Sequence, residues 1–274
     1  MSTVTKEAIL EAVKKFNIES DSILLVHSSL KALGYIEGGA DTVIDALKET
    51  VSEGTLVMPT LSQKNWETVF EDWSLDRPSD TGFITEVFRL RPDSLRSDNA
   101  THSVAASGTH AADLVGGDPK GGARPGIFGD YCFSSESPWQ RMFDSRTRYG
   151  VRAYVMFWGC TMKYNTFKHF SEYRLVEKVL GAVSDPEKKE ALAERISRYG
   201  NTEGKIWPWY NSGDFQLRLE EMGIAKRISL GQGEIVCCDI FDAVSAVDKA
   251  LVEEPETMMK GAILDWLKEA EQCR

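Results

Sequence analysis

Two short apolar runs, separated by one amphipathic segment, constrain the fold of this chain more than any other feature. Residues 22–27 (SILLVH) and 55–59 (TLVMP) are continuous apolar runs of the length typical of buried strands. Residues 40–51 between them place apolar side chains at helical spacing, and Gly54 follows. Strand, helix and strand in this order predict an α/β domain in which helices cover a sheet.

The rest of the chain continues this pattern without an obvious break. Residues 151–159 (VRAYVMFWG) predict a third buried strand, and the small residues 103–108 predict a strand or turn. Helical or amphipathic spacing marks seven further segments: 5–16, 81–89, 165–180, 183–199, 217–222, 240–251 and 258–270. No repeat, low-complexity segment or linker divides the sequence, so we expect one domain over residues 1–274 with loop insertions.

Two segments lack periodicity and are expected to be loops. Residues 62–78 are rich in Trp and acidic side chains, which is typical of a functional loop or flap, and Asp72 within it is a candidate substrate-binding residue. Residues 118–129 are dense in Gly and Pro.

Charge and cysteine content limit the classes of partner. The net charge of −10, from 32 basic and 42 acidic residues, repels phosphate backbones and argues against nucleic acid. It attracts a polycation such as a polyamine or aminosugar, although acidity for solubility alone is the more common explanation of such a charge. Five cysteines without CxxC spacing argue against a disulfide framework or a zinc site. No apolar run approaches the ~20 residues of a membrane span, and we expect a cytoplasmic protein without metal.

The segment around His169 carries the most chemistry. Asn165 and Thr166 are good N-cap residues for the predicted helix that follows the third strand. Thr166, His169 and Glu172 recur every third residue and therefore share one helix face. The imidazole is a candidate base, the carboxylate its orienting partner and the hydroxyl a donor to an oxyanion. The alternative is a simple cap at Thr166 and a solvated charge at Glu172.

A second polar segment follows the first strand. His27, Ser28 and Ser29 lie where the buried run ends, and Leu30 and Gly34 follow in the turn. Hydroxyls and free N–H groups at the carboxyl end of a strand can face a phosphate. The sequence has neither a Walker A motif nor GxGxxG, so a turn capped by serines remains the alternative.

Two further histidines and one glutamate are weaker candidates for a functional role. His102 lies among small residues and is a possible base, substrate contact or core histidine, while His110 fits a surface position. Glu136 precedes Ser137-Pro138 and could polarise a histidine or hold an amine, or be an ordinary turn acid.

Taken in order, these segments resemble the aminoglycoside 3-N-acetyltransferase family. The matching pieces run through nearly the whole chain: LVHSSLKALG, GTLVMPTLS, TGFITEVFR, RSDNATHSVAASG, SPWQRM, NTFKHFSE and GQGEIVCCDIFDA. Departures occur at Asn99-Ala100, in the turn after Gly159 and over residues 202–214. The departures fall in regions that we expect to shape the acceptor pocket.

The resemblance implies a three-layer α/β/α fold with a central mixed sheet and acetyl-CoA in a cleft. It implies that His169 is the general base, that Thr166 stabilises the tetrahedral intermediate and that Glu136 or Glu172 partners the histidine. CoA is expected along six residues: His27, Ser28, Ser29, Leu30, Gly34 and Ser103. The acceptor is expected at three: Asn165, His102 and Asp72.

The acceptor implied is an amine of an aminoglycoside-like aminosugar, for an enzyme acting as a monomer or homodimer. The same chemistry on a polysaccharide sugar or a secondary metabolite remains open. A hydrolase using Ser28, Ser29 or Ser103 is a further alternative, although no G-x-S-x-G elbow is present. The last alternative is a binding module that holds CoA or a metabolite without catalysing a reaction.

Overall fold

A computed structural model describes residues 3–62, 73–117, 132–201, 212–259 and 261–274. Its sheet has seven strands in the order β3-β4-β2-β1-β5-β7-β6. The strands are β1 Ile23–Ser28, β2 Thr55–Pro59, β3 Leu95–Arg96, β4 Val104–Gly108, β5 Ala153–Trp158, β6 Ala225–Leu230 and β7 Gly233–Asp239. The expected α/β class with a mixed sheet is confirmed.

The three predicted buried strands form the parallel centre of the sheet. Strand β1 pairs in parallel with β2 on one side and with β5 on the other. The flanking strands run antiparallel, with β4 on β2 and β7 on β5. Because β1, β2 and β5 share one direction, their carboxyl ends meet at one edge of the sheet.

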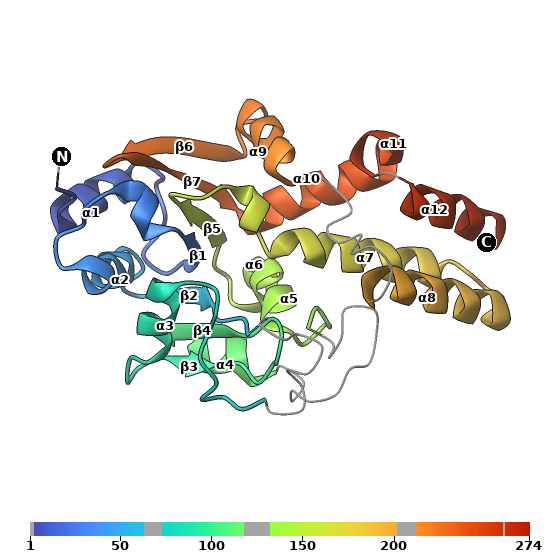
Figure 1. The fold of residues 1–274 in the computed structure, drawn as a ribbon, viewed down its shortest axis with the longest axis horizontal. Coiled ribbons are helices and arrows are strands. Elements are labelled where there is room, and N and C mark those ends of the chain that lie inside the picture. Colours follow the sequence, from blue (N-terminus) through green and yellow to red (C-terminus); the bar gives the residue numbers. More distant parts are fainter. Residues whose placement is uncertain (1–2, 63–72, 118–131, 202–211, 260) are drawn as a thin grey trace.

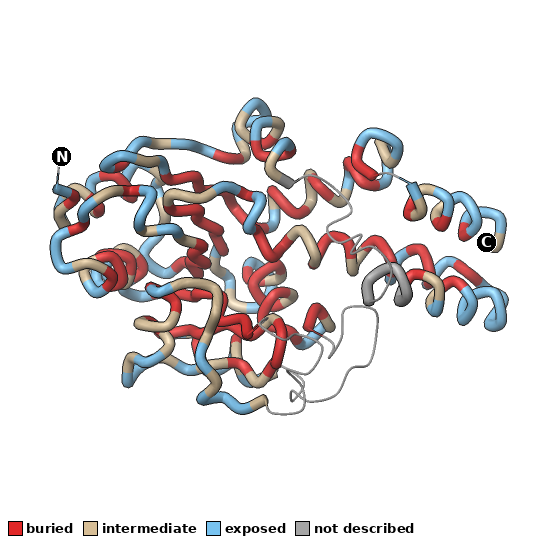
Figure 2. The backbone as a smooth tube through the Cα atoms, viewed as in Figure 1, coloured by how far each residue is buried: buried red, intermediate tan, exposed pale blue. Residues whose placement is uncertain are grey.

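Side chains of β1 alternate between two cores, as a strand with both faces covered requires. Leu24 and Val26 pack with α1 (Lys6–Lys14), α2 (Gly39–Thr50) and α3 (Phe83–Arg89). Ile23 and Leu25 belong to the core on the opposite face. That face is covered by α4 (Ala111–Gly116), α5 (Pro138–Phe143), α6 (Ser145–Arg148), α7 (Phe167–Gly181) and α10 (Ile240–Glu253). The expected three layers are therefore present, and Figure 2 shows burial concentrated along the sheet and the inner helix faces.

The C-terminal helices extend the molecule beyond the sheet (Figure 1). They are α8 (Pro186–Asn201), α11 (Pro255–Met258) and α12 (Ala262–Gln272), while α9 (Ser212–Glu221) precedes β6. The fully buried Trp266 of α12 donates its indole N–H to the Leu192 carbonyl of α8 at 2.9 Å. Within the described residues, no helix combines the length and apolarity needed to cross a bilayer.

The main departure from the predicted elements is the hairpin of β6 and β7. Strand β6 (AKRISL) is half exposed, and its charged side chains hide its strand character from an apolar-run criterion. Most of the predicted loops 62–78 and 118–129 lie outside the described residues.

Candidate active site

A pocket of about 760 Å³ opens at the carboxyl ends of the parallel strands. His27 and Ser28 end β1, Pro59 ends β2 and Gly159 follows β5, and all four line the pocket. In open α/β sheets this edge is the general location of ligand sites. The helix start at Asn165 and Thr166 completes the wall beside His169.

Gly159 allows β5 and the turn after β1 to approach closely. Its φ is +60°, and a Cβ at this position would lie 2.6 Å from the Ser29 carbonyl oxygen and 2.8 Å from the Ala32 Cβ. The Ser29 N–H in turn donates to the Trp158 carbonyl at 2.7 Å. Glycine at this position therefore holds the His27–Ser29 segment against the start of the loop leading to α7.

His169 and Glu172 form a hydrogen-bonded pair on α7. The Nδ1 atom of His169 lies 2.8 Å from Oε2 of Glu172, whose side chain is 0% exposed, while that of His169 is 22% exposed. A carboxylate can only accept a hydrogen bond, so Nδ1 of His169 carries the ring proton and donates to Glu172. The neutral ring therefore has its free lone pair on Nε2. Burial and the nearby Lys168 charge lower the pKa of His169, which favours this neutral form. The predicted i, i+3 contact is present.

The hydroxyl of Thr166 does not cap the N-terminus of α7. The Asn165 side-chain oxygen accepts the Phe167 N–H at 3.1 Å, while Thr166 makes no side-chain cap bond. Of the two candidate caps, Asn165 therefore provides the side-chain contact. Thr166 is 6% exposed and lines the pocket one turn before His169.

Two further imidazoles line the pocket. His27 stacks on Phe157 with ring centroids 5.4 Å apart, and the His102 ring lies 6.2 Å from that of His169. Burial lowers the pKa of both His27 and His102 to about 3. The Nε2 of His27 and the Oγ of Ser28 are buried without a hydrogen-bond partner among the described residues. Buried polar atoms of this kind are usually satisfied, so they indicate a place for a ligand.

The structure places Glu136 away from the role implied by the resemblance. Its Oε2 lies 2.7 Å from Nη2 of Arg141, and its side chain is 59% exposed. Ser137 caps α5 directly after Glu136, so Arg141, one turn along, reaches back to this carboxylate. Of the two carboxylates expected as partners of His169, Glu172 makes the contact and Glu136 is bound by Arg141 instead.

Three other residues expected at CoA do not line the pocket. Ser103 donates its hydroxyl to the Thr60 carbonyl at 2.8 Å and also accepts from Arg96. Leu30 belongs to the short 3-10 helix Leu30–Leu33, and Gly34 packs beside Gln232. Leu30 and Gly34 therefore belong to the turn that follows His27–Ser29, whereas Ser103 ties the end of β2 to Arg96.

The two other histidines predicted from the sequence lie in different environments. His102 lines the pocket, whereas His110 stacks on Tyr149 at 4.4 Å and is remote from the pocket lining. Asp72 lies outside the described residues.

Several pocket residues were missed from the sequence because nothing in their spacing marks them. They are Asp80, Thr81, Thr85, Cys160, Lys163, Tyr164 and Lys168. Lys168 directly precedes His169, but a lysine on a helix is normally a solvated charge.

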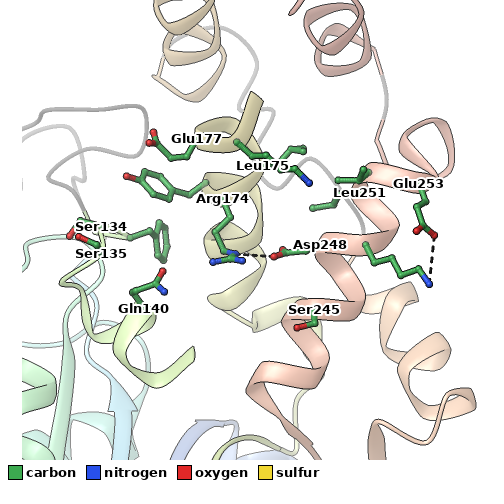
Figure 3. A pocket seen from close by; sticks show the side chains of 15 residues that line it. Ser134, Ser135, Gln140, Arg174, Leu175, Glu177, Ser245, Asp248, Leu251 and Glu253 are labelled. Carbon is green, nitrogen blue, oxygen red and sulfur yellow. Dashed lines mark hydrogen bonds and ion pairs between the residues drawn. The ribbon is translucent and has the colours of Figure 1, made fainter. Parts of the chain in front are cut away.

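A second hollow, of about 840 Å³, lies between α5, α7 and α10 (Figure 3). Across it the Nε of Arg174 donates to Oδ2 of Asp248 at 2.8 Å. The guanidinium also covers the rings of Phe143 and Phe170, at 4.5 and 5.4 Å from their centroids. No histidine is among the described residues that line this α7–α10 groove.

A neutral imidazole held by a buried carboxylate, at the ligand edge of an α/β sheet, is the arrangement of an enzyme that moves protons. A model of the aminoglycoside 3-N-acetyltransferase family matches residues 25–252, and the chain belongs to this family. It is therefore an acetyltransferase, with acetyl-CoA as the acetyl donor.

Individual relatives agree with this assignment. The SPbeta prophage-derived aminoglycoside N(3')-acetyltransferase-like protein YokD of Bacillus subtilis (strain 168) is 28% identical over 276 residues, covering 90% of each chain. Two solved structures share the fold. AAC-IIIb in a binary complex with CoASH superposes with a TM-score of 0.69 and 16% identity, covering 95% of this chain and 100% of that one. The AAC(3)-IVa apoenzyme gives 0.68 and 21%, covering 100% and 99%.

Proposed function

We propose that this enzyme transfers the acetyl group of acetyl-CoA to an amino group of an aminoglycoside-like aminosugar, with His169 as the general base. The observation that carries the proposal is the 2.8 Å contact between His169 and the buried Glu172 at the wall of the pocket. Family membership supplies the reaction class, and the net charge of −10 favours a cationic acceptor.

The pocket has a suitable surface for the donor along the end of β1. The unpartnered Nε2 of His27 and Oγ of Ser28 offer polar contacts to CoA, together with the exposed Ser29. In this proposal the thioester carbonyl lies between that segment and His169.

The acceptor arrives as an ammonium and must lose a proton before it can attack. Nε2 of His169 removes this proton, while Glu172 holds Nδ1 and stabilises the imidazolium that forms. The nitrogen then bonds to the thioester carbon, and the carbonyl oxygen takes up negative charge that Thr166 meets with its hydroxyl. Collapse of this intermediate breaks the C–S bond and releases the CoA thiolate, and the nitrogen loses a second proton, to the thiolate or to solvent, as the amide forms. Asn165 and His102 line the same wall and are positioned to contact the acceptor.

The arrangement of the two hydrophobic cores favours a single domain. Both cores cover faces of a single sheet, so we extend the proposal to one domain over residues 1–274.

The decisive experiment measures free-thiol release from acetyl-CoA against a panel of amines, with aminoglycosides, simple amino sugars and polyamines as separate arms. We expect turnover with aminoglycosides, and a loss of about 10²–10⁴ in the His169→Ala variant with CoA affinity retained. Thiol release without any amine would point instead to a hydrolase. Full activity of His169→Ala would remove this histidine from the mechanism.

A further inference from the structure

The charged side chains of the pocket have no part in the mechanism above. Among the described residues that line the pocket, formal charges are carried by Asp80, Lys163 and Lys168. Positive charge predominates here, although the whole chain carries a net charge of −10. Such a local reversal of sign marks a place where negative charge is bound or develops.

Lys168 is held in a fixed position at this wall. It is the second residue of α7 and is half buried, and its Nζ donates to the Lys163 carbonyl at 2.7 Å. An ammonium has three donors, so this bond fixes the side chain and leaves further donors for a ligand.

Lys168 lines the same pocket as His27, at the end of β1, and His169, its neighbour on α7. Burial lowers the pKa of both of these imidazoles, and the charge of Lys168 lowers it further. Burial also lowers the pKa of Lys168 itself, as expected for an ammonium partly removed from water. The ammonium therefore shares the pocket in which the proposed function puts the thioester.

The acetyl transfer creates negative charge at two atoms. The carbonyl oxygen is charged in the intermediate, and Thr166 is available for it. When the C–S bond breaks, the electron pair moves to sulfur, and none of the residues with a role in the mechanism above meets this second charge.

We propose that Lys168 stabilises the departing CoA thiolate, as the electrostatic partner of the leaving group. The inference rests on the proposed function. Lys168 supplies charge and keeps its proton. The ammonium loses two protons on its way to the amide: the first passes to His169 and then to solvent, and the second passes to the departing thiolate or to solvent. The balance of the reaction needs no further reactant.

The test uses Lys168→Met, which removes the charge while keeping the length, and Lys168→Arg, which keeps a charge. Lys178→Met is the matched control, because Lys178 lies on the same helix in the α7–α10 groove. We expect Lys168→Met to lower kcat by about 10-fold to 100-fold, with a small change in the KM for acetyl-CoA. Lys168→Arg should recover much of kcat, and Lys178→Met should match the wild type.

Short donors separate this role from binding of the CoA phosphates. With S-acetyl-N-acetylcysteamine, which lacks phosphate, Lys168→Met should lose the same factor in kcat as with acetyl-CoA. A loss confined to the KM for acetyl-CoA, absent with the short donor, would overturn the proposal in favour of a phosphate contact.

A second readout needs no acceptor and is independent of the proposed function. The thiol of bound CoA is titrated by its thiolate absorbance in wild type and Lys168→Met, after subtraction of the free protein. Cys160, the cysteine at the pocket, does not interfere, because burial raises its pKa to about 12. We expect the midpoint of bound CoA to lie about one pH unit lower in the wild type, a tenfold difference in thiolate stability. Equal midpoints would overturn the inference even if the enzyme turns over, and a shifted midpoint would sustain it even if no amine is acetylated.

Discussion

The pocket at the carboxyl ends of the parallel strands and the α7–α10 groove are similar in volume, but the first holds neutral imidazoles and the second a charged ion pair. In the pocket, burial keeps the imidazoles of His27 and His102 neutral, with pKa values lowered to about 3. In the groove, Arg174 and Asp248 hold one another as an ion pair, and the guanidinium is covered by aromatic rings. Neutral bases can accept a proton, whereas a closed ion pair has its charge already compensated. Volume alone therefore does not distinguish the two hollows, whereas the state of their ionisable groups does.

The comparison is tested most strongly at Glu172. We expect Glu172→Gln to lower turnover by about 10²–10⁴, because an amide can donate to Nδ1 and favour the wrong tautomer of His169. The measurement is kcat for thiol release with the best acceptor. A matched change in the groove, Asp248→Asn, should leave kcat within about threefold. Equal losses in the two variants would show that the groove also serves catalysis.

Thr166 provides the next test. Replacing Thr166 by Val keeps the shape and removes the hydroxyl, and we expect a loss of about 10²–10³ in kcat with little change in KM. Because Asn165 supplies the side-chain cap of α7, the variant should unfold in urea at nearly the wild-type midpoint. An unchanged kcat would mean that Thr166 has only a packing role.

The neutral histidines also predict how stability depends on pH. His27 and His102 bind protons near pH 6.5 when unfolded and only near pH 3 when folded, so the unfolded chain binds more protons between these values. Stability is therefore lost as pH falls through this window, by up to about 1.4 kcal/mol per pH unit for each histidine.

Urea unfolding at pH 7, 6 and 5 measures this slope in wild type and in His27→Gln. The variant should have the shallower dependence, because one of the three rings with a lowered pKa (His27, His102 and His169) is gone. Parallel curves would contradict the assignment of His27 as a buried neutral group.

The sequence was most informative where one element determines the geometry. The apolar runs of β1, β2 and β5 identified the sheet centre, and the spacing of His169 and Glu172 on one helix predicted their contact. Prediction failed where the position depends on another element. Glu136 has a carboxylate at a plausible place in the sequence, but only the folded chain shows that Arg141 binds it.

Lys168 and strand β6 were missed for a related reason. A lysine on a helix and a half-exposed strand both look like solvated surface until neighbouring elements are in place. The sequence therefore reports local periodicity well, and reports burial of charge poorly.

The smallest expected effect concerns the groove and its ion pair. We expect Arg174→Met to destabilise the fold by about 1–2 kcal/mol, less than for a fully buried pair, since both side chains retain some exposure. The exposed Lys178→Met is the control, and the measurement is the free energy of unfolding in urea.

The pH dependence of that loss tells what Arg174 does. Burial already raises the pKa of Asp248, and removing Arg174 takes away the main charge that opposes this shift, leaving only the weaker effect of Lys178. A carboxyl with a raised pKa in the folded state is destabilising when ionised and recovers stability as it becomes protonated. The deficit of Arg174→Met should therefore shrink as pH falls towards 5, opposite in sign to the effect of the pocket histidines. A deficit independent of pH would mean that Arg174 stabilises the groove through its contacts with Phe143 and Phe170, and not through Asp248.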